Sequence, residues 1–258
     1  MASPSQRESQ ALLSHSMAEG WWFRAKEDIV KEMLRPYLRQ DSAVLVVGTG
    51  NGSTVRRLRQ LAADCSIVGW DIDASAVALC RSVDPRGTYL VVDVEEEWPV
   101  NPCSFDVAIA LDVLEHLQND RDFVRRTVSL LKPSGILAIN VPAHQWLFGQ
   151  HDISLGHARR YSARQLESLI EPDRMELLTS TPLFMTTMIA LVAWRKVIQP
   201  VLRLRSDRSD VDLRLPAALD HALYLIARAE AVLAPIYLPF GSSHFVLARR
   251  MAEHTGSS

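Results

Sequence analysis

Short apolar runs that alternate with helical stretches restrict the fold of this chain more than any other feature of its sequence. Strands are predicted at 43–47, 66–70, 89–92, 105–110, 135–140, 175–179 and 244–249. Helical patterns fall between them, at about 53–63, 75–82, 120–131 and 164–170. The run 43–47 is apolar throughout, which is typical of a strand covered on both faces in a parallel sheet. Because strands that alternate with helices form right-handed βαβ crossovers, we expect an α/β fold with helices on both faces of a seven-stranded, mostly parallel sheet.

The composition excludes several classes of protein. The 258 residues are 48% hydrophobic and 22% charged, as in an ordinary globular domain. Because 28 basic residues stand against 30 acidic ones, no basic field draws the chain to nucleic acid. Cys65, Cys80 and Cys103 form no Cys-x-x-Cys pair and the histidines follow no zinc signature, so we expect neither a disulfide framework nor a metal. The start of the chain lacks the basic and apolar stretches of a secretory signal, which favours a cytoplasmic location.

Two regions depart from the alternation of strands and helices. Residues 1–40 are predicted as an N-terminal helical segment, with a frayed start at 1–16 and a helical pattern at about 19–38. Residues 183–238 are predicted as a helical insertion, with apolar stretches at 183–194 and 217–233 around a charged middle at 203–214. The core domain would then comprise 41–182 and 239–251. The stretch 183–194 is shorter than the roughly 20 residues of a membrane span, so we expect no transmembrane helix.

The insertion is open to more than one role. It would cover the substrate site or form the face of a homodimer. Its apolar length also suits a lipid-like substrate or a peripheral contact with a membrane. Arg203, Arg205 and Arg208 in its charged middle are expected to lie on a solvated surface, with an anionic partner as the alternative.

The most informative motif is a glycine-rich turn directly after the first strand. Gly48, Gly50 and Gly52 allow the backbone to turn tightly and let a ligand approach its amide groups. Asp71 ends the next strand about 20 residues further on, the place of a ribose-hydroxyl acceptor in a nucleoside-binding βαβ unit. The third glycine comes one residue earlier than in the Gly-x-Gly-x-x-Gly turn that binds a pyrophosphate, so the spacing suits an adenosyl ligand without phosphates. A glycine turn with a purely structural role is the alternative.

Further motifs end the third and fourth strands. Asp93 and Val94 follow the third, and the fourth leads into Leu111-Asp-Val-Leu-Glu-His116. With the glycine turn, Asp71 and the run Leu130-Leu-Lys-Pro-Ser-Gly135, these motifs make residues 43–141 similar to class I S-adenosylmethionine-dependent methyltransferases. The likeness is to the small-molecule branch that includes ubiquinone-biosynthesis-like enzymes. Residues 21–24, 152–161 and 239–243 resemble flanking motifs of one subgroup more loosely.

The resemblance implies a Rossmann-like fold, S-adenosyl-L-methionine as cofactor, S-adenosyl-L-homocysteine as product, and a set of cofactor-binding residues. That set is Gly48, Thr49, Gly50, Gly52, Asp71, Ile72, Asp93, Val94, Leu111, Asp112, Trp22 and Arg24. In it Asp71 binds the ribose, Asp93 and Val94 bind the adenine, and Leu111 and Asp112 lie beside the methionine end. Trp21, Trp22 and Phe23 would close over the cofactor as an aromatic lid, with Arg24 near its carboxylate. Packing of these aromatic residues into the core is an equal alternative.

One position departs from the family pattern. Val46 stands in the first strand where the family usually has Asp or Glu, and Thr49 stands where Cys or Ser is common. The missing acid is an acceptor for the ammonium group of the cofactor, so its loss would lower affinity unless a neighbouring acid substitutes. A degenerate member that transfers no methyl group is the other consequence.

Histidines gather after the fourth and fifth strands, at the edge where open α/β sheets bind ligands. His116 and His157 are candidate catalytic bases, because imidazole titrates near neutrality and a hydroxyl or amine acceptor must lose a proton. His116 could equally cap the following loop. A polar cluster is expected to line the substrate pocket: His144, His151, Asp152, Arg160 and Tyr161. A hydrogen-bonded loop that braces the next helix is its structural alternative.

These observations predict an enzyme that moves a methyl group from S-adenosylmethionine to an oxygen, nitrogen or carbon nucleophile of a small or lipid-like metabolite by in-line displacement. The alternative is a degenerate methyltransferase fold that acts as a non-catalytic cofactor-binding or interaction module. A nicotinamide-dependent dehydrogenase fits worse because of the glycine spacing. A nucleic-acid methyltransferase fits worse because the sequence shows no basic face and no Asn/Asp-Pro-Pro-aromatic motif.

Overall fold

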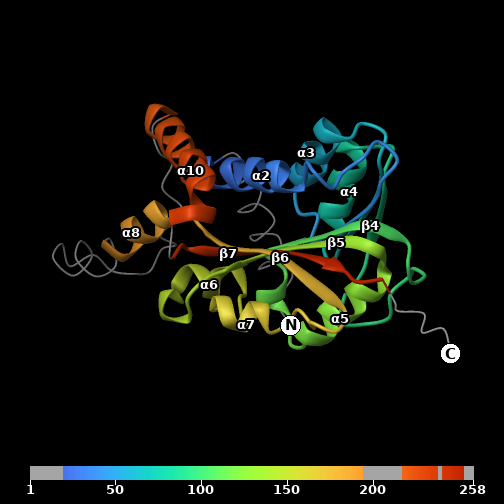
Figure 1. The fold of residues 1–258 in the computed structure, drawn as a ribbon. Coiled ribbons are helices and arrows are strands. Elements are labelled where there is room, and N and C mark those ends of the chain that lie inside the picture. Colours follow the sequence, from blue (N-terminus) through green and yellow to red (C-terminus); the bar gives the residue numbers. More distant parts are fainter. Residues whose placement is uncertain (1–19, 194–216, 238–239, 253–258) are drawn as a thin grey trace.

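A seven-stranded mixed sheet forms the centre of the molecule (Figure 1). The structure is a computed structural model and describes residues 20–193, 217–237 and 240–252. The strands are β1 Ala43–Val47, β2 Ser66–Asp71, β3 Thr88–Val91, β4 Phe105–Leu111, β5 Leu131–Pro142, β6 Met175–Leu183 and β7 Ser243–Arg250. Their order is β3-β2-β1-β4-β5-β7-β6, and only β7 runs antiparallel to its neighbours. The predicted seven-stranded, mostly parallel α/β fold is confirmed.

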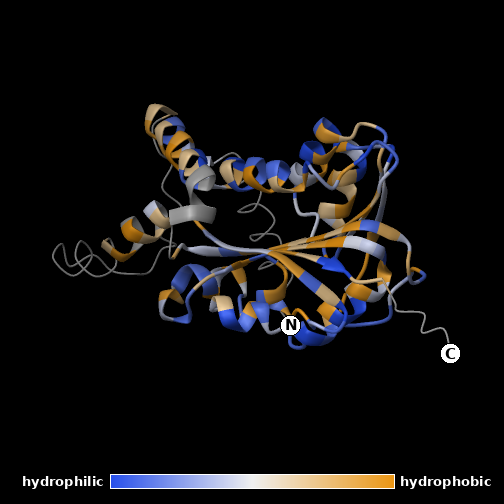
Figure 2. Ribbon diagram, in the orientation of Figure 1, coloured by the Kyte–Doolittle hydropathy of each residue, from blue (hydrophilic) through white to orange (hydrophobic). Residues whose placement is uncertain are grey.

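Helices cover both faces of the sheet (Figure 1). On one side lie α2 Trp21–Leu34, α3 Ser53–Leu61, α4 Ala74–Val83 and α10 Ala217–Tyr237, with α8 Met185–Ala193 at the end of the sheet. On the other lie α5 Asp120–Leu130, α6 Gln150–Leu155 and α7 Ala163–Glu167. Two 3-10 turns, η1 Leu114–His116 and η2 Gln145–Leu147, follow β4 and β5. Apolar residues concentrate along the strands and polar residues on the outer surfaces of α3, α5 and α6 (Figure 2).

The sheet separates two hydrophobic cores, and β1 contributes to both. Leu45 and Val47 belong to the core beneath α5 and α7, while Val44 and Val46 belong to the core beneath α2 and α3. All four side chains are at most 3% exposed. A strand that is buried on both faces needs apolar residues at every position, which explains the unbroken apolar run that predicted it.

Helix α10 packs along α2, so part of the region 183–238 lies against the N-terminal helix. The Tyr224 hydroxyl donates to Asp28 Oδ2 at 2.6 Å, and the Trp21 amide donates to Asp220 Oδ1 at 2.8 Å. Arg24 pairs with Asp220 and lies 5.0 Å from the centroid of the Tyr224 ring. These polar contacts fix the position of α2 at its amino end.

Strand β6 is longer than the sequence pattern predicts. It continues from the expected 175–179 to Leu183, because its antiparallel pairing with β7 extends to the pair Leu183 and Ser243. The charged segment 203–214, with its arginines, and the N-terminal 1–16 lie outside the described residues. Within the described ranges, no helix combines the length and apolar character needed to cross a membrane.

Removal of the Asp84 carboxylate is expected to destabilise the fold, because Asp84 is buried and paired. Arg59 binds it through two nitrogens, at 3.1 and 2.7 Å, and the Tyr89 hydroxyl donates to it at 2.7 Å. Burial alone would raise the pKa of Asp84, but these donors lower it, so the ionised form stabilises the fold at neutral pH and that contribution is lost as the pH falls through the folded-state pKa, below about 4. We expect Asp84→Ala to lower the free energy of unfolding by about 3 kcal/mol in urea denaturation at pH 7.

Asp64→Ala provides the matched control for that measurement. The Asp64 side chain is 78% exposed and stands 3.6 Å from Arg86, so its removal should change stability by less than about 0.5 kcal/mol. Equal losses in the two variants would contradict the assignment of the Asp84 cluster.

Candidate functional site

The glycine turn lies between β1 and α3, at the carboxyl edge of the sheet. Gly48, Gly50 and Gly52 have φ values of +71°, +50° and +74°, a region that side chains with a Cβ rarely adopt. The Gly48 amide donates to the Trp70 carbonyl at 2.8 Å, which brings the turn onto the end of β2. A Cβ on Gly48 would stand 2.6 Å from Val113, whereas one on Gly50 would meet nothing within 4 Å. The protein therefore leaves no room for a side chain at Gly48, whereas the space next to Gly50 is open.

Asp71 meets the glycine turn directly. Its Oδ2 accepts from the Gly50 amide at 2.8 Å and its Oδ1 accepts from the Asp73 amide at 2.9 Å. Burial raises the pKa of Asp71, and the two backbone donors oppose that rise. The following residue, Ile72, is 67% exposed and presents an apolar surface beside the same edge. The structure thus brings together the turn and the acid that the sequence pattern paired.

The end of β3 contributes Asp93 and Val94 to the same edge. Asp93 Oδ1 accepts from the Glu95 amide at 2.9 Å, which fixes the carboxylate at the start of a turn. Val94 is partly buried against the core, and its carbonyl accepts from the Trp98 indole at 2.9 Å. These two residues therefore have a defined backbone conformation next to the end of β2.

At the end of β4, Asp112 forms a partly buried ion pair that the sequence analysis did not predict. Asp112 has a φ of +54°, and its Oδ1 accepts from the Asn140 amide group at 2.7 Å. Its Oδ2 pairs with the ammonium of Lys26 on α2. The Lys26 side chain is 5% exposed and its nitrogen lies 4.3 Å from the centroid of the Trp22 ring. The sequence signal that could have identified it is a lysine four residues after a tryptophan, a spacing that places both side chains on one face of the helix.

The two α2 residues that the family resemblance assigns to the cofactor contact other parts of the protein. Arg24 faces α10, where it contacts Asp220 and Tyr224, and among the described residues these contacts do not reach the glycine turn. Trp22 packs against Phe184, with ring centroids 5.6 Å apart, and covers Lys26. The helix turns its arginine away from the site because successive positions on a helix face different directions.

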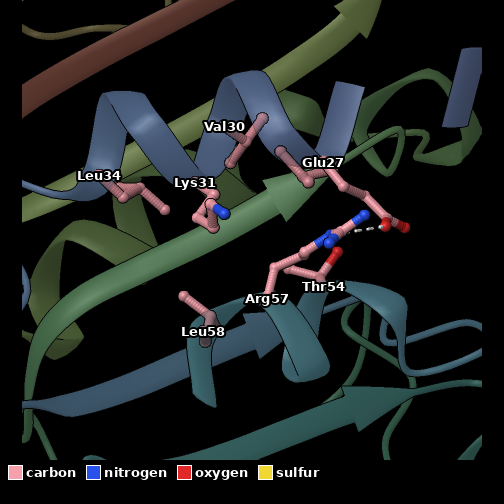
Figure 3. A pocket seen from close by; sticks show the side chains of 8 residues that line it. Glu27, Val30, Lys31, Leu34, Thr54, Arg57 and Leu58 are labelled. Carbon is pink, nitrogen blue, oxygen red and sulfur yellow. Dashed lines mark ion pairs between the residues drawn. The ribbon is translucent and has the colours of Figure 1, made fainter. Parts of the chain in front are cut away.

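The position that lacks the family acid lies under α2 and α3. Val46 is 1% exposed in the core there. Nearby, a small pocket opens between the two helices, lined by Glu27, Val30, Lys31, Leu34, Thr54, Arg57, Leu58 and Leu111 (Figure 3). Glu27 points toward Arg57, with Oε2 3.7 Å from Nε, and burial raises its pKa. Glu27 of α2 is thus a buried acid near β1, the strand in which Val46 stands where the family usually has an acid.

A second cluster surrounds η1, after β4. Glu115 is fully buried, and neither of its carboxylate oxygens has a hydrogen-bond partner. Its Oε1 lies 3.9 Å from His157 Nε2, and the His116 and His157 rings meet edge to face at 4.8 Å between centroids. Burial and the neighbouring Asp112 raise the pKa of Glu115 well above its usual range. Partial desolvation and His157 lower the pKa of His116, which favours the neutral imidazole.

Asp152 fixes the orientation of His157. Its Oδ1 lies 2.9 Å from His157 Nδ1 and accepts from Arg160 Nε at 2.8 Å, while its Oδ2 accepts from the Gly149 amide. Burial alone would raise the pKa of Asp152, but the hydrogen bonds from His157 and Arg160 lower it to about 2. The carboxylate is therefore ionised, and it holds the Nδ1 edge of the imidazole.

Among the residues expected to line the substrate pocket, Asp152, Arg160 and Tyr161 are buried in an internal network. The Tyr161 hydroxyl donates to Leu114 O at 3.0 Å and to Asp120 at 2.7 Å. Arg160 Nη1 donates to Ala143 O at 3.2 Å. These contacts brace the loop that carries η1. His144 and His151 are half-buried after β5, with the His144 ring 5.6 Å from that of Trp146.

Within the described part of the chain, one group of side chains has the spacing of metal ligands. Glu115, His116 and His157 each offer a ligand atom, and these atoms lie within 4.8 Å of one another. Sequence reasoning singled out both histidines and passed over Glu115, because nothing in the sequence shows that a glutamate after a strand is fully buried and unpaired.

Comparisons with known proteins bear on the same edge of the sheet. Residues 45–139 match the model of a family described as a methyltransferase domain. A "probable S-adenosylmethionine-dependent methyltransferase" of Mycolicibacterium smegmatis is 28% identical over 165 residues, covering 62% of this chain and 61% of the relative. A mitochondrial ubiquinone biosynthesis O-methyltransferase of Rattus norvegicus is 35% identical over 103 residues, covering 37% of this chain and 29% of that enzyme. The chain thus spans less than two thirds of the length of these relatives.

A solved structure extends the similarity of fold to almost the whole chain. A chain from the complex between the Haloferax volcanii Trm112 methyltransferase activator and a methyltransferase superposes with a TM-score of 0.64. It is 15% identical in sequence, and the match covers 98% of this chain and 99% of that one. At this identity the match describes the fold alone.

Proposed function

We propose that this chain is a class I S-adenosylmethionine-dependent methyltransferase, and that it moves a methyl group from S-adenosylmethionine to an oxygen, nitrogen or carbon nucleophile of a small or lipid-like metabolite. The observation that carries the proposal is the contact between Asp71 and the Gly50 amide, beside a glycine turn that is open above Gly50. An acid at this point accepts from ribose hydroxyls, and the missing Cβ leaves room for the adenosyl group. Relatives in the ubiquinone branch are O-methyltransferases by name, which supports a small-molecule acceptor.

The adenosyl half of the cofactor is proposed to lie across the ends of β1, β2 and β3. Asp71 would accept from the ribose hydroxyls, and Asp93 would accept from the adenine amino group beside Val94. The exposed Ile72 side chain would pack on the adenine ring. Thr49, Gly48 and Gly52 set the backbone of the turn that faces the cofactor.

The methionine half is proposed to bind the ion pair at the end of β4. Its carboxylate and ammonium groups form a zwitterion, and Lys26 with Asp112 offers one charge of each sign. The cofactor carboxylate would pair with Lys26, and its ammonium with Asp112 beside Leu111. The pair would thus take over the role of the acid that Val46 replaces, because a carboxylate at the end of β4 reaches the same edge of the sheet as one in β1.

Transfer from the sulfonium is an in-line displacement, so the protein contributes mainly alignment and the exclusion of water. Alignment of this kind lowers barriers by about 7–11 kcal/mol. A hydroxyl or amine acceptor must also lose a proton, and groups that promote this contribute roughly 10²- to 10⁴-fold. We place the acceptor next to Asp112, against His116 and His157, and assign these two histidines the loss of its proton.

The region 183–238 is proposed to cover the acceptor. Ile189 on α8 and Leu219, Leu225 and Ile226 on α10 are 45–53% exposed, which leaves apolar surface for a lipid-like molecule, a membrane surface or a second copy of the chain. The buried network of Asp152, Arg160 and Tyr161 would position this end of the site through the loop that it braces.

Substitutions of Lys26 and Arg24 test the placement of the methionine end. We propose that the cofactor carboxylate pairs with Lys26, whereas the family resemblance places Arg24 near it. We expect Lys26→Met to raise the dissociation constant for S-adenosylhomocysteine by about tenfold or more, because a charge-assisted hydrogen bond of about 1.5–3 kcal/mol is lost. Arg24→Met, which alters the contact with α10, should leave that constant within about twofold. Calorimetric titration of both variants checks this. If Arg24→Met raises the dissociation constant more than Lys26→Met does, Arg24 rather than Lys26 pairs with the cofactor carboxylate.

The proposed activity is tested by transfer of a labelled methyl group. The purified chain is incubated with S-adenosylmethionine labelled on the methyl carbon and with panels of phenols, amines and membrane lipids, and labelled products are extracted. Transfer to at least one acceptor, abolished by Asp71→Ala, is the expected result. Weak cofactor binding without transfer to any panel member would support the second candidate, a non-catalytic cofactor-binding or interaction module, which the replacement of the family acid by Val46 favours.

A further inference from the structure

We propose that Asp28 is a positioning residue that couples cofactor binding to the placement of α10, a helix of the region proposed to cover the acceptor. A cofactor bound at the glycine turn stabilises α2 in its position, and α2 in turn holds α10 in place. The inference rests on the proposed function, because it concerns how two ends of that same site are connected. It is carried by three consecutive charged residues of α2 and by the elements that they contact.

These three residues carry their charged side chains into the interior. Lys26, Glu27 and Asp28 are 4%, 7% and 5% exposed, although side chains of these types are almost never buried unless they are paired. Successive positions on a helix point in different directions, so neighbouring side chains reach different elements. Helix α2 lies between α3 and α10 (Figure 1). Lys26 pairs with Asp112 after β4, and the other two residues connect α2 to the helices on either side.

Glu27 connects α2 to the glycine turn. Helix α3 begins at Ser53, directly after Gly52, and the start of this helix carries the partners of Glu27. Burial raises the pKa of Glu27, and a side-chain hydrogen bond with Ser53 opposes that rise. Glu27 Oε2 also lies 3.7 Å from Arg57 Nε (Figure 3). A ligand that fixes the backbone of the glycine turn therefore restrains the start of α3, and through it α2.

Asp28 joins α3 to α10 through a single carboxylate. Its Oδ1 lies 3.2 Å from Arg57 Nε, on α3. Its Oδ2 accepts from the Tyr224 hydroxyl at 2.6 Å and lies 3.9 Å from Arg228 Nη1, both on α10. Because Arg57 also faces Glu27, a continuous chain of polar contacts runs from the glycine turn to α10. Asp28 is the member of that chain that contacts both helices.

These contacts make the position of α10 and the affinity for the cofactor depend on each other. Lys26 faces the place proposed for the cofactor carboxylate while α2 keeps this position, and α10 holds α2 there. A ligand that binds one arrangement of a protein more tightly shifts the population toward it. Cofactor binding therefore favours the docked position of α10, and docking of α10 strengthens cofactor binding by the same factor. The acceptor is thus covered when the methyl donor is present, which keeps water from the reaction.

Hydrogen exchange of the full chain, followed by mass spectrometry with and without saturating S-adenosylhomocysteine, tests this coupling. In the wild type we expect the ligand to slow amide exchange both at the glycine turn and in residues 217–228 of α10. In Tyr224→Phe, which removes one hydroxyl from a partly buried ring, the ligand should slow exchange at the turn but no longer in α10. Calorimetric titration of this variant should give a dissociation constant raised about fivefold, the lower end of ordinary coupling between two sites.

Asp28→Asn should lose the response of α10 in the same way, and Tyr224→Phe keeps the test informative if that buried variant does not fold. Glu32→Gln is the matched control, because Glu32 is an exposed acid of the same helix that pairs with Arg35 of that helix. It should respond to the ligand as the wild type does. A contact with a merely structural role would change exchange in α10 equally with and without the ligand, so the response to the ligand is the decisive readout.

Two results would overturn the coupling and leave the proposed function unaffected. In one, the ligand binds and protects the glycine turn of the wild type without slowing exchange in α10. In the other, it slows exchange in α10 equally in the wild type and in Tyr224→Phe. If the ligand neither binds nor slows exchange anywhere in the wild type, the proposed function fails, and the coupling fails with it.

Discussion

Asp71→Ala is expected to weaken binding of S-adenosylhomocysteine by roughly 10- to 150-fold, the effect of losing a charged hydrogen bond of about 1.5–3 kcal/mol. The carboxylate accepts from the Gly50 and Asp73 amides and is the acceptor proposed for the ribose. Its removal therefore takes away a ligand contact and also loosens the turn on which the adenosyl group lies. Isothermal titration of the wild type and the variant measures the change.

Asp73→Ala is the matched control for this prediction. Asp73 lies two residues further on and caps α4 through the Ser75 amide at 2.8 Å. Its loss should cost about 1 kcal/mol of stability and leave the ligand affinity nearly unchanged. If Asp71→Ala binds as tightly as the wild type, or if both variants lose affinity equally, Asp71 does not hold the ribose.

Two glycine substitutions are expected to distinguish an effect on the stability of the fold from an effect on ligand binding. A Cβ at Gly48 would stand 2.6 Å from Val113, so Gly48→Ala should add a steric clash to the roughly 1–2 kcal/mol cost of a left-handed backbone. Gly50→Ala carries only the second cost, since nothing lies within 4 Å of its Cβ. That Cβ would instead enter the space proposed for the cofactor.

We therefore expect Gly48→Ala to lower the unfolding midpoint substantially more than Gly50→Ala. The folded Gly50→Ala protein should nevertheless fail to bind S-adenosylhomocysteine at concentrations that saturate the wild type. Thermal denaturation followed by circular dichroism, together with calorimetric titration, measures both effects. Undiminished binding by Gly50→Ala would place the cofactor somewhere other than above this turn.

The strands and the contact between the glycine turn and Asp71 were predictable because they follow from short sequence patterns. A strand such as β1, covered on both faces, must be apolar at every position, and a turn with several positive φ values strongly favours glycine. Asp71 follows from the same βαβ geometry, in which successive parallel strands end at one edge of the sheet. The apolar strand, the glycine turn and the acid at the end of the next strand can each be identified from a short stretch of sequence.

The ion pair of Lys26 with Asp112 and the histidine cluster were not predictable in the same way, because they depend on long-range packing. Lys26 reaches Asp112 because α2 lies across the end of β4, and that position depends on contacts of α2 with α10. Arg24 faces away for the same reason. Glu115 is unpaired because of what surrounds it after folding. Periodicity in the sequence describes one element at a time and does not describe how distant elements meet.

The central claim is that this chain binds S-adenosylmethionine at the carboxyl edge of its sheet. Calorimetric titration of the purified protein with S-adenosylmethionine, S-adenosylhomocysteine and reduced nicotinamide dinucleotide tests it most directly. We predict saturable one-to-one binding of both sulfur nucleosides in the micromolar range and no binding of the dinucleotide. Binding of the dinucleotide alone, or of none of the three, would contradict the claim.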